Sequence, residues 1–150
     1  LLKKLNIKKK IVGGYFPISS EIDDINLLNE FRKRGFKTSL PVIKKNLKMI
    51  FVEWSSKDPL CVNKFGIPEP SNNKKVIPDI ILIPLVSFDK KLTRLGYGGG
   101  FYDRFLNNIK NKKKIVKIGL AFSCQLSKNF LPKSPHDQAV DFVVTEKKIY

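Results

Sequence analysis

The sequence holds few of the side chains that build metal and thiol centres. Its 150 residues include two cysteines, one histidine, one methionine and one tryptophan. Cys61 and Cys124 stand outside any C-x-x-C arrangement, and with a single histidine they do not supply the ligands of a structural zinc site. We expect both cysteines to be reduced packing residues in a cytoplasmic protein.

Long apolar segments are also missing. No run approaches the roughly 18 residues of a membrane-spanning helix, and no signal-peptide pattern is visible. The apolar share of 42% is ordinary for a globular protein. Because 150 residues suit one domain with one core, we expect residues 1–150 to form a single domain.

Acidic side chains are scarce, with 13 Asp and Glu against 29 Lys and Arg, which gives a formal net charge of +16. Such an excess is typical of proteins that bind nucleic acids. Here, however, nearly all the positive charge is lysine spread along the chain, beside abundant asparagine and isoleucine. That composition is what an AT-rich genome over-produces. We expect no nucleic-acid partner, and we keep a basic nucleic-acid-binding protein as the alternative.

Arginine is rare, and two of the four arginines, Arg94 and Arg104, bracket the stretch RLGYGGGFYDR. Where lysine is the default cation, an arginine suggests a need for its planar, bidentate fork. The four glycines within residues 96–100 let a ligand approach the backbone closely, and successive N–H groups can form an anion-binding nest. A helix beginning near Phe101 would add its positive N-terminal end. The stretch therefore predicts a phosphate-binding loop.

Two commoner phosphate motifs do not fit this loop. A P-loop needs Gly-Lys-Ser/Thr after its glycines, whereas Gly100 is followed by Phe101 and Tyr102. A dinucleotide fingerprint needs a third glycine at the position of Phe101 and an acidic partner about 20 residues further on. The plain alternative is a glycine-rich surface turn. An aspartate at position 103 would repel a polyphosphate unless Mg²⁺ stands between them.

The remaining pattern alternates strands and helices. Strands are expected at residues 10–16, 37–43, 47–54, 80–83, 114–122 and 141–145, and helices at 21–34 and 101–109, with a loop over 57–75. Ser20 fits an N-cap, Gly35 fits the position after a helix end, and Pro41 indicates an edge strand or a bulge. The continuous apolar run at 80–83 is typical of a buried parallel strand. This order predicts a three-layer α/β domain, Rossmann-like, with a largely parallel mixed sheet and helices on both faces.

The glycine loop resembles the signature of the 5-formyltetrahydrofolate cyclo-ligase family. The match runs from Arg94-Leu95-Gly96 through Tyr102-Asp103, preceded by PLVSFD at residues 84–89, and FGIPEP at 65–70 resembles another family segment. Phe101 stands where the family has tyrosine, so that hydroxyl is missing. The resemblance covers nearly all of the chain. It implies ATP-dependent cyclisation of 5-formyltetrahydrofolate to 5,10-methenyltetrahydrofolate, with release of ADP and phosphate.

The resemblance also implies the residues of the site. Arg94 and Tyr102 would be catalytic, and Asp103 and Asp137 would approach Mg²⁺, which prefers oxygen ligands and phosphates. ATP would bind Arg94, Leu95, Gly96, Tyr97, Gly98, Gly99, Gly100, Phe101 and Tyr102. The folate substrate would bind Phe16, Glu21, Tyr97, Gly98, Gly99, Gly100 and Phe101. Asp103 has a plain alternative as a first-turn residue that favours the helix dipole, and Asp137 could simply cap a turn.

Glu21 follows the first expected strand at the start of a helix. Its plain role is to interact with the helix dipole. The resemblance implies contact with the pterin part of folate, because a carboxylate accepts a pair of hydrogen bonds from amino and ring N–H donors. Phe16 would add a flat apolar wall, although an aromatic residue in a strand is core by default.

Residues 1–7 look like the end of an amphipathic helix. Family members usually have a longer N-terminal helix whose Lys and Arg side chains help to bind the nucleotide. We therefore expect a domain that lacks its N-terminal helix, and an inactive fragment is a further alternative. The expected partners are the small molecules ATP and 5-formyltetrahydrofolate, with no membrane, and the expected state is a monomer.

Overall fold

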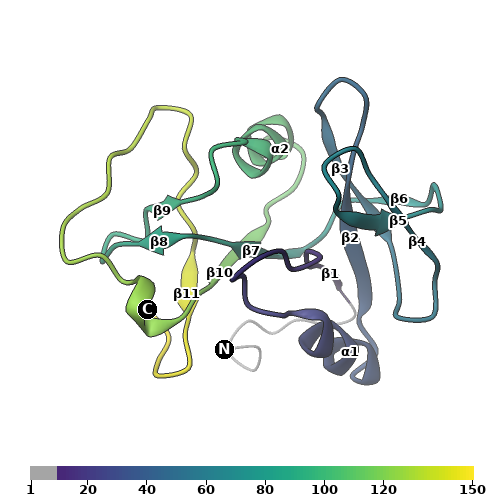
Figure 1. Ribbon diagram of the computed structural model, residues 1–150, viewed down its shortest axis with the longest axis horizontal. Coiled ribbons are helices and arrows are strands. Elements are labelled where there is room, and N and C mark those ends of the chain that lie inside the picture. Colours follow the sequence, from purple (N-terminus) through teal and green to yellow (C-terminus); the bar gives the residue numbers. More distant parts are fainter. Residues whose placement is uncertain (1–9) are drawn as a thin grey trace.

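A seven-stranded mixed sheet forms the centre of the computed structural model, which describes residues 10–150 (Figure 1). In spatial order its strands are β11 (Phe142–Val144), β10 (Val116–Leu120), β7 (Ile80–Pro84), β1 (Ile11–Gly13), β2 (Lys37–Ile43), β3 (Met49–Glu53) and β6 (Lys75–Val76). The first five are mutually parallel, and β3 is antiparallel to both of its neighbours. The predicted strands and the largely parallel mixed sheet are confirmed.

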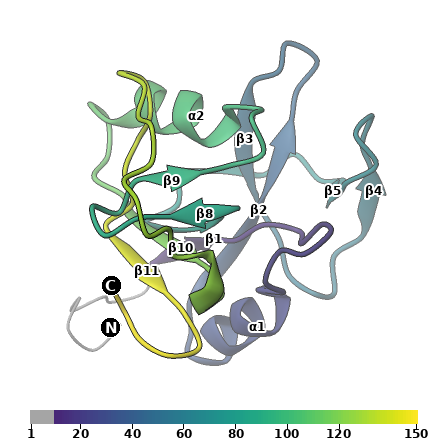
Figure 2. The same cartoon turned by 60° about the vertical axis from the view of Figure 1, so that its left-hand side comes forward.

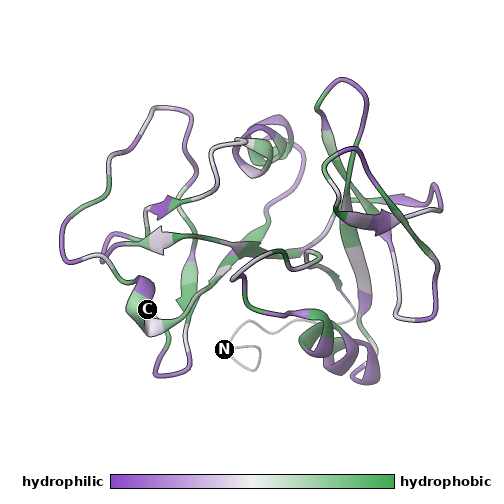
Figure 3. Ribbon diagram, in the orientation of Figure 1, coloured by the Kyte–Doolittle hydropathy of each residue, from purple (hydrophilic) through white to green (hydrophobic). Residues whose placement is uncertain are grey.

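One helix covers each face of the sheet. Figures 1 and 2 place α1 (Ile25–Lys33) and α2 (Phe101–Ile109) on opposite sides. The side chains of β7 alternate between the two: Ile80 and Leu82 belong to the cluster of α1, while Ile81 and Ile83 belong to the cluster of α2. All four are at most 1% exposed, so burying each contributes about 1.5–3 kcal/mol. The three-layer prediction is confirmed, and Figure 3 shows the hydrophobic residues concentrated on these inner elements.

Pro41 lies in an inner strand, so the predicted edge position is wrong for β2 as a whole. The strand pairs with β3 along Ser39–Ile43, but β1 pairs only with Lys37, Thr38 and Ser39. Beyond Ser39, the side of β2 that faces β1 has no strand partner. Proline lacks a backbone N–H, and this short local edge is where its absence is tolerated.

Helix α1 begins later than the sequence predicted and ends where it predicted. Its N-cap is Asp24 rather than Ser20, which lies in a turn. At the other end Gly35 has φ 84°, its N–H donates to the carbonyl of Arg32, and the N–H of Phe36 donates to the carbonyl of Phe31. These two bonds form a Schellman motif, and the rings of Phe31 and Phe36 pack edge to face at 5.4 Å.

The segment predicted as a loop over residues 57–75 contains a small hairpin, β4 (Leu60–Val62) and β5 (Pro68–Pro70). A second hairpin, β8 (Ser87–Phe88) and β9 (Arg94–Leu95), precedes α2, and a 3₁₀ helix spans Ser123–Gln125. Cys61 on β4 and Cys124 in the 3₁₀ helix are both exposed and free, so their predicted packing role is wrong.

The predicted helical segment at residues 1–7 lies outside the described residues. Among the helices within residues 10–150, none has the length and apolar character needed to cross a membrane.

Gly35→Ala should lower the free energy of unfolding by about 1–2 kcal/mol, because an L-residue is strained at positive φ. Nothing lies within 4 Å of the position of an added Cβ, so the loss of stability measures backbone strain without a steric clash. Gly35→Asn is the control, since asparagine tolerates this conformation better. Urea unfolding measures both variants, and an alanine variant as stable as the wild type would contradict the assignment.

Candidate active site

The strands β1 and β7 lie side by side at a switch point of the sheet. They are parallel, with Val12 opposite Ile80 and Gly13 opposite Ile81. After β1 the chain continues to β2 on one side, and after β7 it reaches β10 on the other. In open α/β sheets, ligands bind beyond the carboxyl ends of strands that diverge in this way. The segments that follow β1 and β7 are therefore the place to look for a site.

The segment after β7 carries the glycine loop, residues 96–100, between β9 and α2. Gly98 (φ 86°) and Gly100 (φ 61°) occupy the left-handed region, which explains the need for glycine there. Gly100 is the N-cap of α2 and provides no side-chain cap. Among the described residues, the N–H groups of the loop donate no hydrogen bond. The loop and the helix start thus offer free N–H donors, a suitable arrangement for an anion.

Two side chains hold the glycine loop from outside. Nη2 of Arg104 donates to the carbonyl of Gly99 at 2.9 Å, and its guanidinium lies 5.0 Å from the centre of the Phe101 ring. The ring of Phe65, from the β4–β5 hairpin, packs edge to face on Phe101 at 5.9 Å. Phe101 therefore serves as an apolar contact between the hairpin and the loop, a role that needs no hydroxyl.

A largely buried ion pair lies beneath the loop. Nη2 of Arg94 on β9 donates to Oδ1 of Asp103 on α2 at 2.9 Å, and the two side chains are 7% and 18% exposed. The same Oδ1 accepts the N–H of Gln138 at 2.9 Å, so the pair also anchors the C-terminal segment against α2 (Figure 2). Nε of Arg94 is buried and has no partner among the described residues. Arg94 thus keeps unused donor capacity beside the loop.

The segment after β1 folds back on itself. The N–H of Tyr15 donates to Oδ2 of Asp24 at 3.1 Å, and the Tyr15 hydroxyl donates to the carbonyl of Ile22 at 2.7 Å. Oε2 of Glu21 accepts the N–H of Ile18 at 2.9 Å. Burial raises the pKa of Glu21, although its hydrogen bond from Ile18 acts in the opposite direction. Glu21 is half-buried at the outer end of this turn.

Tyr102 connects the two segments. Burial raises the pKa of its hydroxyl, the charges of Asp24 and Glu21 raise it further, and the charge of Arg94 lowers it. Tyr102 in turn raises the pKa of Tyr15, after burial, Asp24 and Glu21. Tyr102 thus interacts electrostatically with the acidic turn after β1 and with Arg94 on β9. Both segments follow neighbouring parallel strands of the sheet.

Comparison with known proteins decides the family. The model of the 5-formyltetrahydrofolate cyclo-ligase family matches residues 2–146. The chain belongs to this family. It is 39% identical over 127 residues to the 5-formyltetrahydrofolate cyclo-ligase of Haemophilus influenzae, covering 80% of this chain and 67% of that one. It is 32% identical over 146 residues to the cyclo-ligase of Escherichia coli K12, covering 93% and 79%.

Solved structures of cyclo-ligase relatives have the same fold. The NMR structure of the 5,10-methenyltetrahydrofolate synthetase of Aquifex aeolicus matches with a TM-score of 0.77 and 36% identity, over 94% of this chain and 71% of that one. The Mycoplasma pneumoniae synthetase matches with a TM-score of 0.67 and 29% identity, over 90% and 72%. The family assignment and the α/β fold predicted from the sequence are confirmed.

The residues that the cyclo-ligase resemblance assigns to ATP form one continuous segment from β9 through the glycine loop into the first turn of α2. Leu95 and Tyr97 are 45% and 56% exposed, so their side chains face solvent. Phe16 is partly buried in the segment after β1, on the Glu21 side. The structure brings these groups to one edge of the sheet, and their ligand contacts stay predictions.

The two aspartates assigned to metal lie on neighbouring segments. Gln138, the residue after Asp137, donates its N–H to Asp103, as described above. Oδ2 of Asp137 accepts the N–H of Ser134 at 2.7 Å, and Asp137 is partly buried. Within residues 10–150, no group of three or more His, Cys, Asp or Glu side chains is placed to hold a metal ion. A metal here would need ligands from a substrate.

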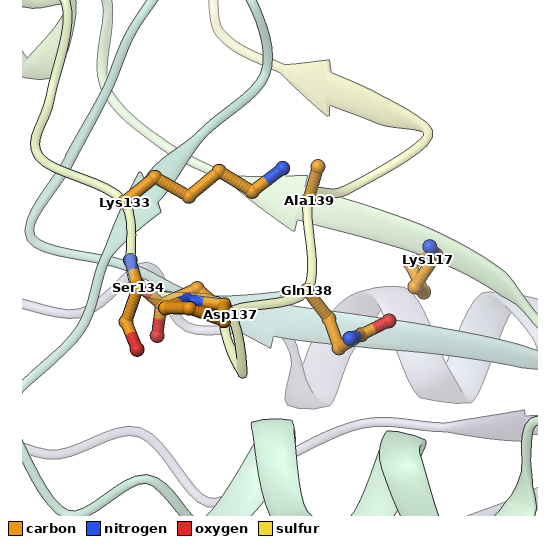
Figure 4. A pocket seen from close by; sticks show the side chains of 7 residues that line it. Lys117, Lys133, Ser134, Asp137, Gln138 and Ala139 are labelled. Atoms are coloured by element: carbon orange, nitrogen blue, oxygen red, sulfur yellow. The ribbon is translucent and has the colours of Figure 1, made fainter.

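An open cavity of about 650 Å³ adjoins Asp137 (Figure 4). It is lined by Lys117, Lys133, Ser134, Pro135, Asp137, Gln138 and Ala139. Lys117 is already paired with Asp141 at 3.5 Å. In Figure 4 Lys133 extends toward Ala139 across the opening. Asp137 lines this cavity, whereas Glu21 does not.

Sequence reasoning missed three residues of the site. Arg104 was noted only as a flanking arginine, although it bonds to the loop itself. Phe65 belongs to the FGIPEP segment, and that unusual motif was the available signal. Asp24 could not be distinguished from its acidic neighbours Glu21 and Asp23, because burial selects among them. Asp24 is 1% exposed, whereas Asp23 faces solvent.

Asp24→Asn should make the chain more stable in alkali. Burial raises the pKa of Asp24 from 3.8 to about 8 in the folded state. The folded chain then holds a proton that the unfolded chain has lost, so stability falls as pH rises from about 4 to about 8. Asparagine removes this loss, and its advantage should grow with pH by up to about 1.4 kcal/mol per unit.

Urea unfolding across this pH range measures the difference between the variant and the wild type. Asp23→Asn is the matched control, because it removes the neighbouring exposed carboxylate. An advantage of Asp24→Asn that does not change with pH would contradict the assignment.

Proposed function

We propose that the protein catalyses the ATP-dependent cyclisation of 5-formyltetrahydrofolate to 5,10-methenyltetrahydrofolate. The supporting observation is that two segments follow neighbouring parallel strands at the point where the chain diverges. One is a loop whose N–H groups donate no hydrogen bond among the described residues, and the other is a turn with a half-buried glutamate. Such a place can hold two different ligands against each other. The relatives named as cyclo-ligases and methenyltetrahydrofolate synthetases support the same reaction.

In this reaction ATP phosphorylates the formyl group, which is otherwise a poor electrophile. The formyl oxygen attacks the γ-phosphorus of ATP, a new O–P bond forms, and the bond to ADP breaks. The neighbouring amine nitrogen of the folate then attacks the formyl carbon and loses its proton. Phosphate leaves with the original formyl oxygen, which completes the ring. The protein supplies positioning and charge neutralisation rather than a nucleophile.

The glycine loop would hold the phosphates. Its free N–H groups and the start of α2 would donate hydrogen bonds to phosphate oxygens. Arg94 would neutralise the charge that develops during transfer, using the donors that Asp103 leaves free. A tyrosine hydroxyl keeps its proton at neutral pH, and burial raises the pKa of Tyr102 further, so it would donate a hydrogen bond to the transferring group.

Mg²⁺ fits the two aspartates as a partner of the bound nucleotide. Oδ1 of Asp103 accepts two hydrogen bonds and Oδ2 accepts none, while Asp137 uses only Oδ2. Each carboxylate thus retains one oxygen. Mg²⁺ commonly takes one or two carboxylates and completes its shell with water and substrate phosphates. When bound, the ion would offset the repulsion between Asp103 and the polyphosphate.

The folate would lie on the other side of Tyr102. Glu21 would accept hydrogen bonds from the pterin, because Oε1 makes none among the described residues. Phe16 would pack against the flat ring. The loop residues 97–100 and Phe101 would contact both substrates, as the family resemblance implies.

The proposal extends to the oligomeric state, the substrates and the cellular compartment of the protein. We propose a monomer whose residues 1–150 form one domain. Its substrates are small molecules, and two exposed free cysteines suit the reducing cytoplasm. Binding of RNA remains the competing outcome for so basic a chain.

The purified protein, given 5-formyltetrahydrofolate and Mg-ATP, should form a product with the near-ultraviolet absorbance of the methenyl compound. ADP and phosphate should appear in equal amounts, because one phosphoryl transfer accompanies each ring closure. Omitting Mg²⁺ or ATP should abolish the signal. Absence of product, together with tight RNA binding at physiological salt, would contradict the proposal and favour the nucleic-acid alternative.

Arg94→Lys should weaken ATP use by about tenfold or more in kcat/KM, because lysine lacks the planar fork that serves Asp103 and phosphate together. Arg34→Lys, at an exposed position after α1, is the matched control and should behave like the wild type. Steady-state kinetics with ATP varied measures both. An Arg94→Lys enzyme with near-normal ATP constants would rule out the assigned role.

A further inference from the structure

The turn after β1 is closed by a buried carboxyl group. Asp24 is 1% exposed, and its Oδ2 accepts the N–H of Tyr15, nine residues earlier. A Cβ added to Gly14 would collide with this carboxyl and with Leu28, so the backbone must pass close over Asp24. Asp24 is also the N-cap of α1, yet its side chain makes no cap hydrogen bond. The side chain is turned away from the helix and toward the end of β1.

The surroundings of Asp24 are unsuited to a negative charge. Its Oδ1 has no partner, and none of the ion pairs among the described residues includes Asp24. The charged or titratable groups that influence it and its contact Tyr15 are Asp23, Glu21 and Tyr102. None of these is a cation. A buried carboxylate without a cation is costly, so the group holds a proton instead.

We propose that Asp24 is a positioning residue whose neutral carboxyl clamps the Gly14–Tyr15 backbone and thereby holds Glu21 in place for the folate. Tyr15 transmits this effect because its hydroxyl bonds to Ile22, the residue after Glu21. The bonded residues all lie in the turn after β1, whereas Arg94 lies on β9 and the glycine loop follows it. The clamp therefore acts on the folate half of the site and not on the phosphate half.

Ionisation would release the clamp. A charged Asp24 beside Glu21 and Asp23 needs water, and water can reach it only if the turn moves off the end of β1. Glu21 would then move with the turn. The pKa of Asp24, which burial raises to about 8, puts this change in mild alkali. Affinity for the folate should fall above that pH while affinity for ATP stays level.

Kinetics with the proposed substrates test the clamp. Between about pH 6.5 and about 9.5, the wild-type KM for 5-formyltetrahydrofolate should rise about tenfold, with the KM for ATP nearly constant. Asp24→Asn keeps an oxygen acceptor without a charge, so its folate KM should stay flat. Asp24→Ala should have a raised folate KM at every pH. Asp23→Asn should retain the wild-type profile, because that carboxylate is exposed.

An alkaline rise that persists in Asp24→Asn, or folate and ATP constants that change together in Asp24→Ala, would overturn the inference. The kinetic arm rests on the proposed function, so a second arm needs no substrate. The amide resonance of Tyr15 in the free protein should titrate near pH 8 in the wild type and not in Asp24→Asn. A titrating amide without enzymatic activity would refute the proposed function alone. A Tyr15 amide that does not titrate would refute the clamp.

Discussion

The ion pair between Arg94 and Asp103 holds together the elements that make the site. It joins β9 to α2, and through Gln138 it also fixes the segment that carries Asp137. Removing one member of a buried pair typically costs about 3–5 kcal/mol, because the remaining charge is left without a partner. The glycine loop spans the distance between these two residues. The shape of the loop therefore depends on an ion pair that also occupies one of the hydrogen-bond donors of Arg94.

This double use distinguishes the observed site from a simple phosphate loop. Among the described residues, Arg94 donates one N–H group to Asp103 and keeps others free, and Asp103 keeps one oxygen free. In the proposed complex, a nucleotide with its cation would use both residues without first breaking the pair. Preorganised charges of this kind need little rearrangement when the reaction begins. This double use also explains why one of the few arginines of the chain stands here, since a guanidinium has several hydrogen-bond donors.

Local sequence patterns predicted the elements whose structure depends on residues close in the sequence. The apolar run of β7, the start of α2 at Phe101 and the end of α1 at Gly35 all follow from residues close in sequence. Pro41 was misjudged because β1 is too short to pair with all of β2, a fact of the sheet rather than of the strand. The glycine loop was recognised because its residues are contiguous, and its ligand contacts stay predictions.

Asp24 and Phe65 escaped prediction for the same physical reason. Burial decides which of three nearby acids closes the turn, and a contact across a hairpin decides which aromatic residue supports the loop. Neither the burial nor the contact can be deduced from the spacing of residues in the sequence. Contacts between residues far apart in the chain appear only once the sheet is assembled.

The parallel pairing of β1 with β7 has a kinetic consequence. Val12 finds Ile80 across a long stretch of intervening chain, whereas β2 and β3 pair through a short connection. Contacts between distant residues form slowly, because the chain entropy lost in closing the loop comes before the gain. The pairing of β1 with β7, beyond which the candidate site lies, is therefore among the last features to form. A newly synthesised chain should acquire its capacity to bind ligands only as folding is completed.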